Sequence, residues 1–163
     1  MIERDYIMRM ITMLTAVIKK LFALKEAREY PQALEELQHQ CRSLLGVDLE
    51  LLGSFEPSSL AHLFGSDPHM ASTKCYAAGL LLSERADVLD LLGRADEAAA
   101  DRAQSLGLLL EAYQIADDHV DPRHAELIDR LSDSVSPLPD ALGQQLLAYR
   151  EESAAQITPP DDQ

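Results

Sequence analysis

The densest group of side chains capable of chemistry lies between residues 117 and 124. Three carboxylates, Asp117, Asp118 and Asp121, and two imidazoles, His119 and His124, occur within eight consecutive positions. Both groups are ligands for divalent metals, so the segment could form a metal site in a small enzyme or sensor. However, Asp121 precedes a proline as a helix cap does, Asp117 and Asp118 follow a predicted helix end, and ligands must converge in space. We therefore predict no metal site at this cluster.

A second pattern is the Glu-x-x-His element formed by Glu36 and His39. Di-iron helical bundles need two such elements together with carboxylates from two further helices. This chain contains only one element of this kind. Its two side chains also fall opposite the apolar face marked by Leu34, Leu37 and Cys41. We therefore expect Glu36 and His39 to point to water.

The remaining histidines and the two cysteines have structural interpretations. His62 and His69 flank a connector around Asp67, and we interpret them as a loop histidine and a first-turn histidine rather than an acid–base pair. Cys41 and Cys75 lie among apolar positions, where a thiol stays protonated and unreactive. Both cysteines are predicted to belong to the core.

The motifs of the common catalytic classes are missing from the sequence. There is no G-x-S-x-G elbow, no G-x-x-x-x-G-K-[ST] phosphate loop, no G-x-G-x-x-G after a strand and no H-E-x-x-H zinc motif. We expect that the chain is not an enzyme, and that it has no catalytic residue, no cofactor and no bound metal.

The composition indicates one acidic globular domain. The chain has 163 residues, of which 47% are hydrophobic, and a formal net charge of −14. A polyanion would be repelled, so nucleic acid is excluded as a partner, whereas a basic protein segment would be attracted. The charge is uneven, because residues 1–30 hold six basic and four acidic side chains, and the rest of the chain is strongly acidic.

Compartment signals favour the cytoplasm. The two cysteines form no C-x-x-C pair, and the first residues carry acids where a signal peptide would be basic. The apolar stretch from Met10 to Ile18 has about half the length that spans a bilayer. We expect no membrane partner.

Helical periodicity runs through the chain, and strand patterns are nearly absent, so the predicted class is all-α. Helices are expected at residues 6–27, 31–46, 68–93 and then up to about 116, with a broken helical connector at 47–67. Leu106 lies on the apolar stripe that closes the central pair. A shorter helical pair follows Asp121-Pro122 and is divided at Pro137-Leu-Pro139. We therefore predict three antiparallel hairpins in one domain, residues 1–152, with a tail at 153–163.

The first helix has an unusually wide apolar arc with two sets of side chains. One set, expected to dock on a neighbouring helix, is Ile7, Ile11, Leu14, Ile18 and Leu21. The other set, which needs a further cover, is Tyr6, Met10, Met13, Val17 and Leu24. Three interpretations remain open: a core helix, a dimerisation helix or a membrane-surface helix. If the chain self-associates, we expect this helix to make the interface.

Two stretches resemble tetratricopeptide repeats. Tyr30-Pro-Gln-Ala-Leu-Glu-Glu-Leu37 is similar to the turn and second helix of one repeat, and Leu91-Leu-Gly-Arg-Ala-Asp-Glu-Ala98 to the turn of another. The opening M-I-E-R-D-Y-I-M-R-M-I, with the basic helix and hairpin after it, resembles an uncharacterised family of small bacterial proteins with a tetratricopeptide-like fold. These resemblances imply a right-handed superhelix of helix hairpins and carry no assigned activity.

The sequence therefore predicts a non-catalytic scaffold that binds a protein or peptide, with a basic partner segment favoured by the overall charge. Two alternatives stay open. One is a structural homodimer without a separate ligand, and the other is a small enzyme or sensor that uses the Asp117–His124 cluster.

Overall fold

Helices make up nearly all of the part of the chain that the structure describes. The structure is a computed structural model and describes residues 2–116 and 122–157. The helices are α1 (Ile2–Glu26), α2 (Tyr30–Leu45), α3 (Leu49–Ser54), α4 (Pro57–Phe64), α5 (Pro68–Leu91), α6 (Ala95–Ile115), α7 (Pro122–Ser134) and α8 (Asp140–Ile157). No strand occurs in these two ranges, which confirms the predicted all-α class.

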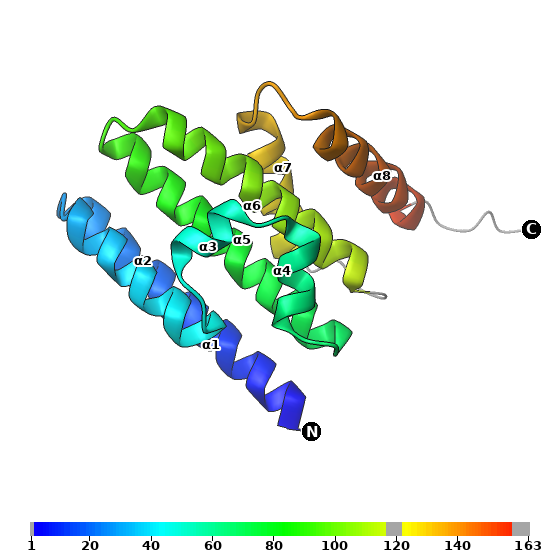
Figure 1. The fold of residues 1–163 in the computed structure, drawn as a ribbon, viewed down its shortest axis with the longest axis horizontal. Helices are drawn as coiled ribbons and strands as arrows, with labels where there is room; N and C mark the ends of the chain where they lie inside the picture. Colours follow the sequence, from blue (N-terminus) through cyan, green and yellow to red (C-terminus); the bar gives the residue numbers. More distant parts are fainter. Residues whose placement is uncertain (1, 117–121, 158–163) are drawn as a thin grey trace, which may run out of the picture.

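The hairpin of α5 and α6 occupies the centre of the molecule (Figure 1). The hairpin of α1 and α2 packs against α5 on one side, and α7 and α8 pack against α6 on the other. The short helices α3 and α4 lie across α5 and α6, in front of them in Figure 1. The predicted connector at 47–67 is therefore a cover over the central hairpin.

Local signals in the sequence explain where the helices begin and end. The Asp67 carboxylate accepts a hydrogen bond from the backbone N–H of Met70 at 3.1 Å, which caps α5 as its Asp-Pro sequence predicts. Gly46, at φ +71°, ends α2, and Gly93, at φ +76°, lies in the turn between α5 and α6. Positive φ values of this kind are unfavourable for residues with a Cβ atom. The predicted cap Asp121 lies outside the described residues.

Small residues bring α5 and α6 close together. A Cβ atom at Gly79 would lie 3.0 Å from Leu109 Cγ and 3.2 Å from the Ser105 carbonyl oxygen. The Ser105 hydroxyl donates a hydrogen bond to the carbonyl of Gly79 and is thereby satisfied inside the interface. The two central helices are therefore in direct backbone contact at this level.

The hydrophobic core consists of two main clusters that share α6. Leu108 and Ala112 of α6 belong to the cluster formed with α1 to α5. Leu106 and Leu110 belong to the cluster formed with α7 and α8, and Leu106 is buried as the sequence predicts. Because neighbouring residues of α6 face opposite clusters, this helix is covered on both sides.

The division of α1 into a docking set and an extra set was wrong. Met10 and Val17, assigned to the extra set, are only 2% and 4% exposed and belong to the core of this chain. Ile11 and Ile18, assigned to the docking set, are only half-buried. The predicted interface residues Met10 and Val17 are therefore unavailable to a second copy, because the rest of the chain already covers them.

Helix α8 continues to Ile157, past the position where the sequence places the start of the tail. Among the described residues, no helix is both long enough and apolar enough to cross a bilayer.

Candidate functional site

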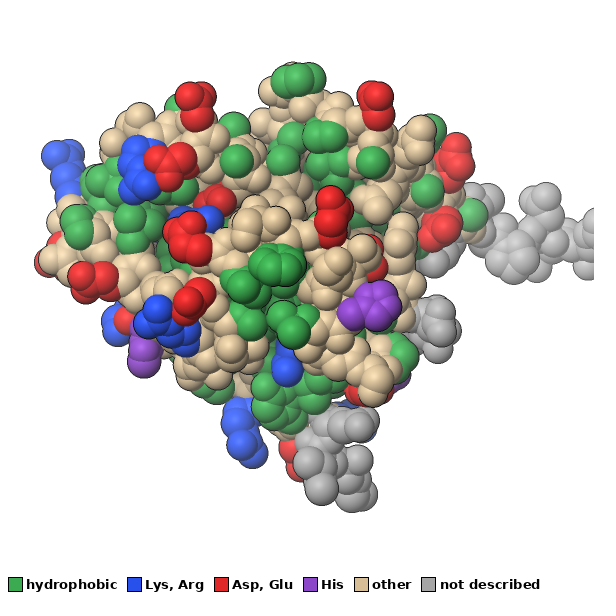
Figure 2. All heavy atoms as spheres, in the orientation of Figure 1, with side chains coloured by type: hydrophobic (Ala, Val, Ile, Leu, Met, Phe, Trp, Pro, Cys, Tyr) green, Lys and Arg blue, Asp and Glu red, His purple; other side chains and the backbone are tan. Residues whose placement is uncertain are grey.

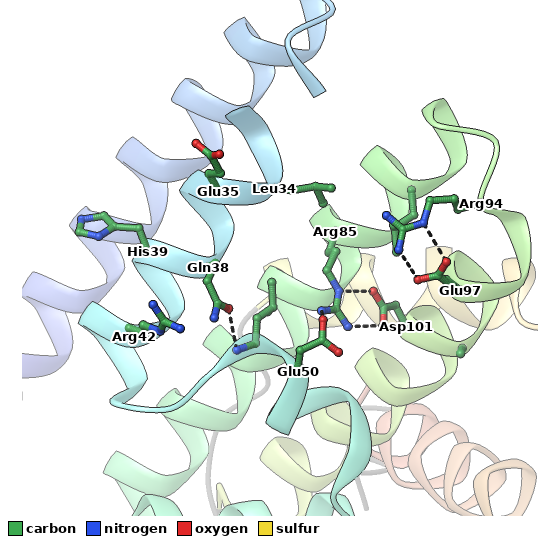
Figure 3. Close-up of a pocket in the computed structure, with 13 residues that line it drawn as sticks. Leu34, Glu35, Gln38, His39, Arg42, Glu50, Arg85, Arg94, Glu97 and Asp101 are labelled. Atoms are coloured by element: carbon green, nitrogen blue, oxygen red, sulfur yellow. Dashed lines mark hydrogen bonds and ion pairs between the residues drawn. The ribbon is translucent and has the colours of Figure 1, made fainter. Parts of the chain in front are cut away.

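One hollow on the surface is a charged cleft among α2, α3, α5 and α6. Its volume is about 630 Å³. Figure 3 shows the residues that line it: Leu34, Glu35, Gln38, His39, Arg42, Leu49, Glu50, Arg85, Leu89, Arg94, Glu97, Ala100 and Asp101.

Arg85 lies at the base of the charged cleft and is held by two carboxylates. Its Nε and Nη2 atoms donate to the two Asp101 oxygens at 2.6 and 2.8 Å, and Nη1 donates to Glu50 Oε1 at 3.2 Å. Burial opposes the charge, but the Asp101 hydrogen bonds keep the pKa of Arg85 above its ordinary value. Gly53 leaves room for the guanidinium, because a Cβ there would lie 3.2 Å from Nη2. Arg85 therefore ties α3, α5 and α6 together.

The other arginines of the charged cleft are also paired. Arg94 binds Glu97 through both Nε and Nη2, and Arg42 binds Asp48 at 2.6 Å. A side chain that is already bound to a carboxylate of its own chain has to break that pair before it can bind a ligand. We therefore interpret the charged cleft as a set of ion pairs that holds the helices together, and not as a ligand-binding site.

Another hollow is a groove with a volume of about 840 Å³, which we call the α1–α5–α7 groove. The first helix of each hairpin contributes to it. The lining residues are Ile7, Ile11, Leu14, Thr15, Ile18 and Lys19 of α1, His69, Ser72, Thr73, Tyr76 and Leu80 of α5, Ala116, and His124, Glu126, Leu127 and Arg130 of α7.

Apolar side chains dominate the α1–α5–α7 groove. Ile11 and Ile18 of α1 and Leu80 of α5 are half-buried and present part of their surface to the open space. Tyr76 and His124 stack with ring centroids 3.8 Å apart and an interplanar angle of 14°, which links α5 to α7.

Hydroxyl groups in the α1–α5–α7 groove are already satisfied by the backbone. Ser72 Oγ donates to the Ala112 carbonyl at 2.8 Å, and Thr73 Oγ1 donates to the His69 carbonyl at the same distance. The groove therefore offers mainly apolar contact to an occupant.

The charged side chains of the α1–α5–α7 groove are mostly basic. Lys19 and Arg130 stand on opposite walls, and Glu126 is the single acid among the lining residues. In the ranges 2–116 and 122–157, neither Lys19 nor Arg130 makes an ion pair. Six other cations are paired with carboxylates, namely Lys20, Lys25, Arg42, Arg85, Arg94 and Arg102. Among the described residues, Arg4, Arg9, Arg28, Lys74 and Arg150 likewise make no ion pair, but none of them lines the groove.

The Asp117–His124 cluster, for which we predict no metal site, lies largely outside the described residues. Asp117, Asp118, His119 and Asp121 all fall in the range that the structure does not describe. Its last member, His124, lines the α1–α5–α7 groove in its stack with Tyr76. Within the described ranges, no three His, Cys, Asp or Glu side chains are grouped as metal ligands would be.

The expectation that Glu36 points to water was wrong. Its side chain is only 13% exposed and accepts hydrogen bonds from Lys20 Nζ at 2.9 Å and Gln40 Nε2 at 2.8 Å. These two hydrogen bonds lower the pKa of Glu36. The carboxylate therefore joins α2 to α1, whereas His39 is exposed as expected.

The cysteines and His69 lie where the sequence predicts, whereas His62, expected in a loop, lies in the last turn of α4. Cys41 and Cys75 are fully buried, and desolvation raises the pKa of each thiol to about 12. His62 is exposed, with Nδ1 2.7 Å from the Ser58 carbonyl oxygen, and His69 is exposed in the first turn of α5.

The α1–α5–α7 groove was not predicted from the sequence. One signal could have indicated it, namely a further stripe on α1 at Met8, Ile11, Thr15, Ile18 and Phe22, spaced three and four residues apart. The other walls come from residues about 60 and 115 positions further along the chain, so only the packing of the hairpins reveals the groove.

No protein-family model, curated protein or solved structure matches this chain.

Proposed function

We propose that the chain is a non-catalytic scaffold that binds a segment of another protein in the α1–α5–α7 groove. The observation that carries the proposal is a groove lined by the first helix of every hairpin, in which α1 and α5 contribute half-buried apolar side chains. Stacked helix hairpins use such concave surfaces for binding.

Energetics favour an occupant at this place. Each square ångström of apolar surface removed from water contributes about 25 cal/mol, so an apolar segment laid against Ile11, Ile18 and Leu80 would gain free energy. In the charged cleft, by contrast, a ligand would compete with the ion pairs of Arg85 and Arg94.

The face that carries α3 and α4 gives less support for a docking site. On this face, acidic and basic side chains are interspersed, and hydrophobic side chains are exposed between them (Figure 2). Mixed charge with scattered apolar groups is the usual condition of a protein surface.

A site-specific cross-link tests the proposal. Thr15, in the groove, is replaced with the photoreactive amino acid benzoylphenylalanine, and Ala16, exposed on α1 but absent from the groove lining, serves as the matched position. Cells producing each variant are irradiated, and adducts are identified by mass spectrometry. We expect a discrete adduct with another protein from position 15 and none from position 16. Equal labelling at the two positions, or no adduct at position 15, contradicts the proposal.

A further inference from the structure

We infer that the occupant of the α1–α5–α7 groove is an amphipathic helix of a partner protein, with carboxylates beside its apolar stripe. This inference rests on the proposed function and adds the shape and the charge of the bound segment. Three observations carry it: the spacing of the free stripe on α1, the helical walls of the groove, and the unpaired cations on its rim.

The free stripe on α1 has the spacing that receives another helix. Met8, Ile11, Thr15, Ile18 and Phe22 follow one another at intervals of three and four residues. Such a 3–4 alternation places the side chains in one seam along the helix. Met8 is 57% and Phe22 is 61% exposed. Helix α1 therefore has one apolar face buried within the chain and, beside it, a stripe that the described residues cover only in part, because Ile11 and Ile18 are half-buried whereas Met8 and Phe22 are exposed.

The groove is lined by three helices. Its α5 side is a run at helical spacing, His69, Thr73, Tyr76 and Leu80, and its two walls are α1 and α7. The lining of α1 extends from Ile7 to Lys19, a length of about 18 Å at 1.5 Å per residue, or roughly three turns. A helix whose apolar residues recur at i, i+3, i+4 and i+7 can insert one face into such a groove.

The charged residues at the rim of the groove determine which charges are favoured beside the apolar stripe of the bound helix. Lys19 and Arg130 stand on opposite walls and make no ion pair within the described ranges, although the chain carries a net charge of −14. Carboxylates on both sides of a bound apolar stripe would reach these two cations. The net charge does repel an acidic helix at a distance, but salt screens exposed charges beyond roughly 8 Å, so the contacts at the rim decide the preference.

The net charge of the whole chain alone predicts a basic partner. At the rim of the groove, Lys19 and Arg130 instead favour an acidic segment. A second copy is also disfavoured as the occupant, because its docking brings two bodies of charge −14 within the screening length, whereas a short bound helix brings only its own flanking carboxylates. Both of these occupants remain outcomes of the test.

Two labelled helical peptides test the inference. They share one leucine stripe at 3–4 spacing, and the flanking positions are glutamate in one peptide and lysine in the other. Fluorescence anisotropy measures binding to the wild type, to the double variant Lys19→Glu and Arg130→Glu, and to Arg9→Glu with Arg28→Glu. The last variant makes the same change in net charge at exposed positions away from the groove. Circular dichroism checks that each variant is folded.

The glutamate peptide is expected to bind the wild type about tenfold more tightly than the lysine peptide at physiological salt. The Lys19 and Arg130 double variant should reverse this order, and the Arg9 and Arg28 double variant should preserve it. Ile11→Asp should abolish binding of the glutamate peptide.

Three results overturn the inference. Tighter binding of the lysine peptide that is lost in Ile11→Asp means that the groove accepts a helix of the opposite charge, and the proposed function survives. Insensitivity of both peptides to Ile11→Asp means that no helix enters the groove, and the Thr15 cross-link then decides whether any protein does. A wild-type dimer in light scattering that Ile11→Asp converts to a monomer assigns the groove to a second copy.

Discussion

Arg85 and Asp101 form the most heavily buried ion pair of the described chain, and removing one partner would destabilise the fold. Asp101 accepts two hydrogen bonds from the guanidinium, which also reaches the exposed Glu50. Breaking a buried pair leaves one charge without its partner in a poorly solvated place. The stability of the central hairpin therefore depends on residues that the sequence alone would place on a surface.

Asp101→Asn is expected to destabilise the fold strongly. The amide leaves Arg85 with only the exposed Glu50 as a charge partner, a loss of about 3 kcal/mol for a buried pair. Glu50→Gln is the matched control, because the Glu50 side chain is 90% exposed and such a pair contributes less than about 1 kcal/mol. Urea denaturation followed by circular dichroism measures both. Equal losses for the two variants would show that Asp101 is not the dominant partner.

Glu111, unlike the Arg85–Asp101 pair, lowers the stability of the fold when it is charged, and this effect can be tested by varying the pH. Burial raises the pKa of this carboxyl, and nearby His62 offsets the effect only in part. The folded state therefore holds the proton more tightly than the unfolded state, so this group's contribution to stability is complete below the unfolded value of 4.5 and falls as pH rises through the folded pKa.

Glu111→Gln is expected to remove that loss, so the variant should be more stable than the wild type at pH 7 and less different from it near pH 4. Unfolding free energies measured at several pH values give the difference curve. A difference that is constant with pH would mean that Glu111 titrates alike in the folded and unfolded states.

At the scale of the elements, the close approach of α5 and α6 depends on the missing side chain of Gly79. In the present packing, an added methyl group would meet Leu109 Cγ at 3.0 Å and the Ser105 carbonyl oxygen at 3.2 Å. The leucine can adjust its rotamer, but the backbone carbonyl is fixed in α6, so the helices have to separate.

Gly79→Ala is expected to lower the unfolding free energy by about 1–3 kcal/mol, the usual cost of overpacking. Gly143→Ala is the control, because nothing lies within 4 Å of its added Cβ and the residue is in α8. Since alanine favours helix over glycine by about 1 kcal/mol, the control should be stabilising. Thermal denaturation of the two variants should shift in opposite directions, and a stabilised Gly79→Ala protein would mean that the helices tolerate a wider spacing.

Element boundaries could be predicted from the sequence wherever a cap or a turn residue fixes them locally. Asp67-Pro68 begins α5 and Gly46 ends α2, because these signals act within one turn of the chain. Which faces of each helix are buried could not be predicted, because burial depends on which other helices pack against that helix. Met10 and Glu36 show this: the packing of α1 against other helices buries Met10 and half-buries Glu36 of α2, and the spacing of these residues does not reveal it.

At the scale of the whole molecule, the candidate site is a property of the arrangement of hairpins. Ile11, Tyr76 and Arg130 lie far apart along the chain and meet only because α1, α5 and α7 line one hollow. The sequence contained the apolar stripe and the cations, but not the fact that they share a surface. The Asp117–His124 cluster, which is conspicuous in the sequence, contributes His124 to this hollow through its stack with Tyr76.

The sharing of α6 between the two main hydrophobic clusters makes the halves of the molecule thermodynamically dependent on each other. If α7 and α8 detach, Leu106 and Leu110 become exposed, and if α1 to α4 detach, Leu108 and Ala112 become exposed on the same helix. Either partial opening leaves α6 with one apolar face in water. A helix gains most of its stability from packing against its neighbours, so α6 would be destabilised. The chain should therefore unfold as one cooperative unit and not repeat by repeat, which distinguishes it from long arrays of hairpins whose neighbours are coupled only in series.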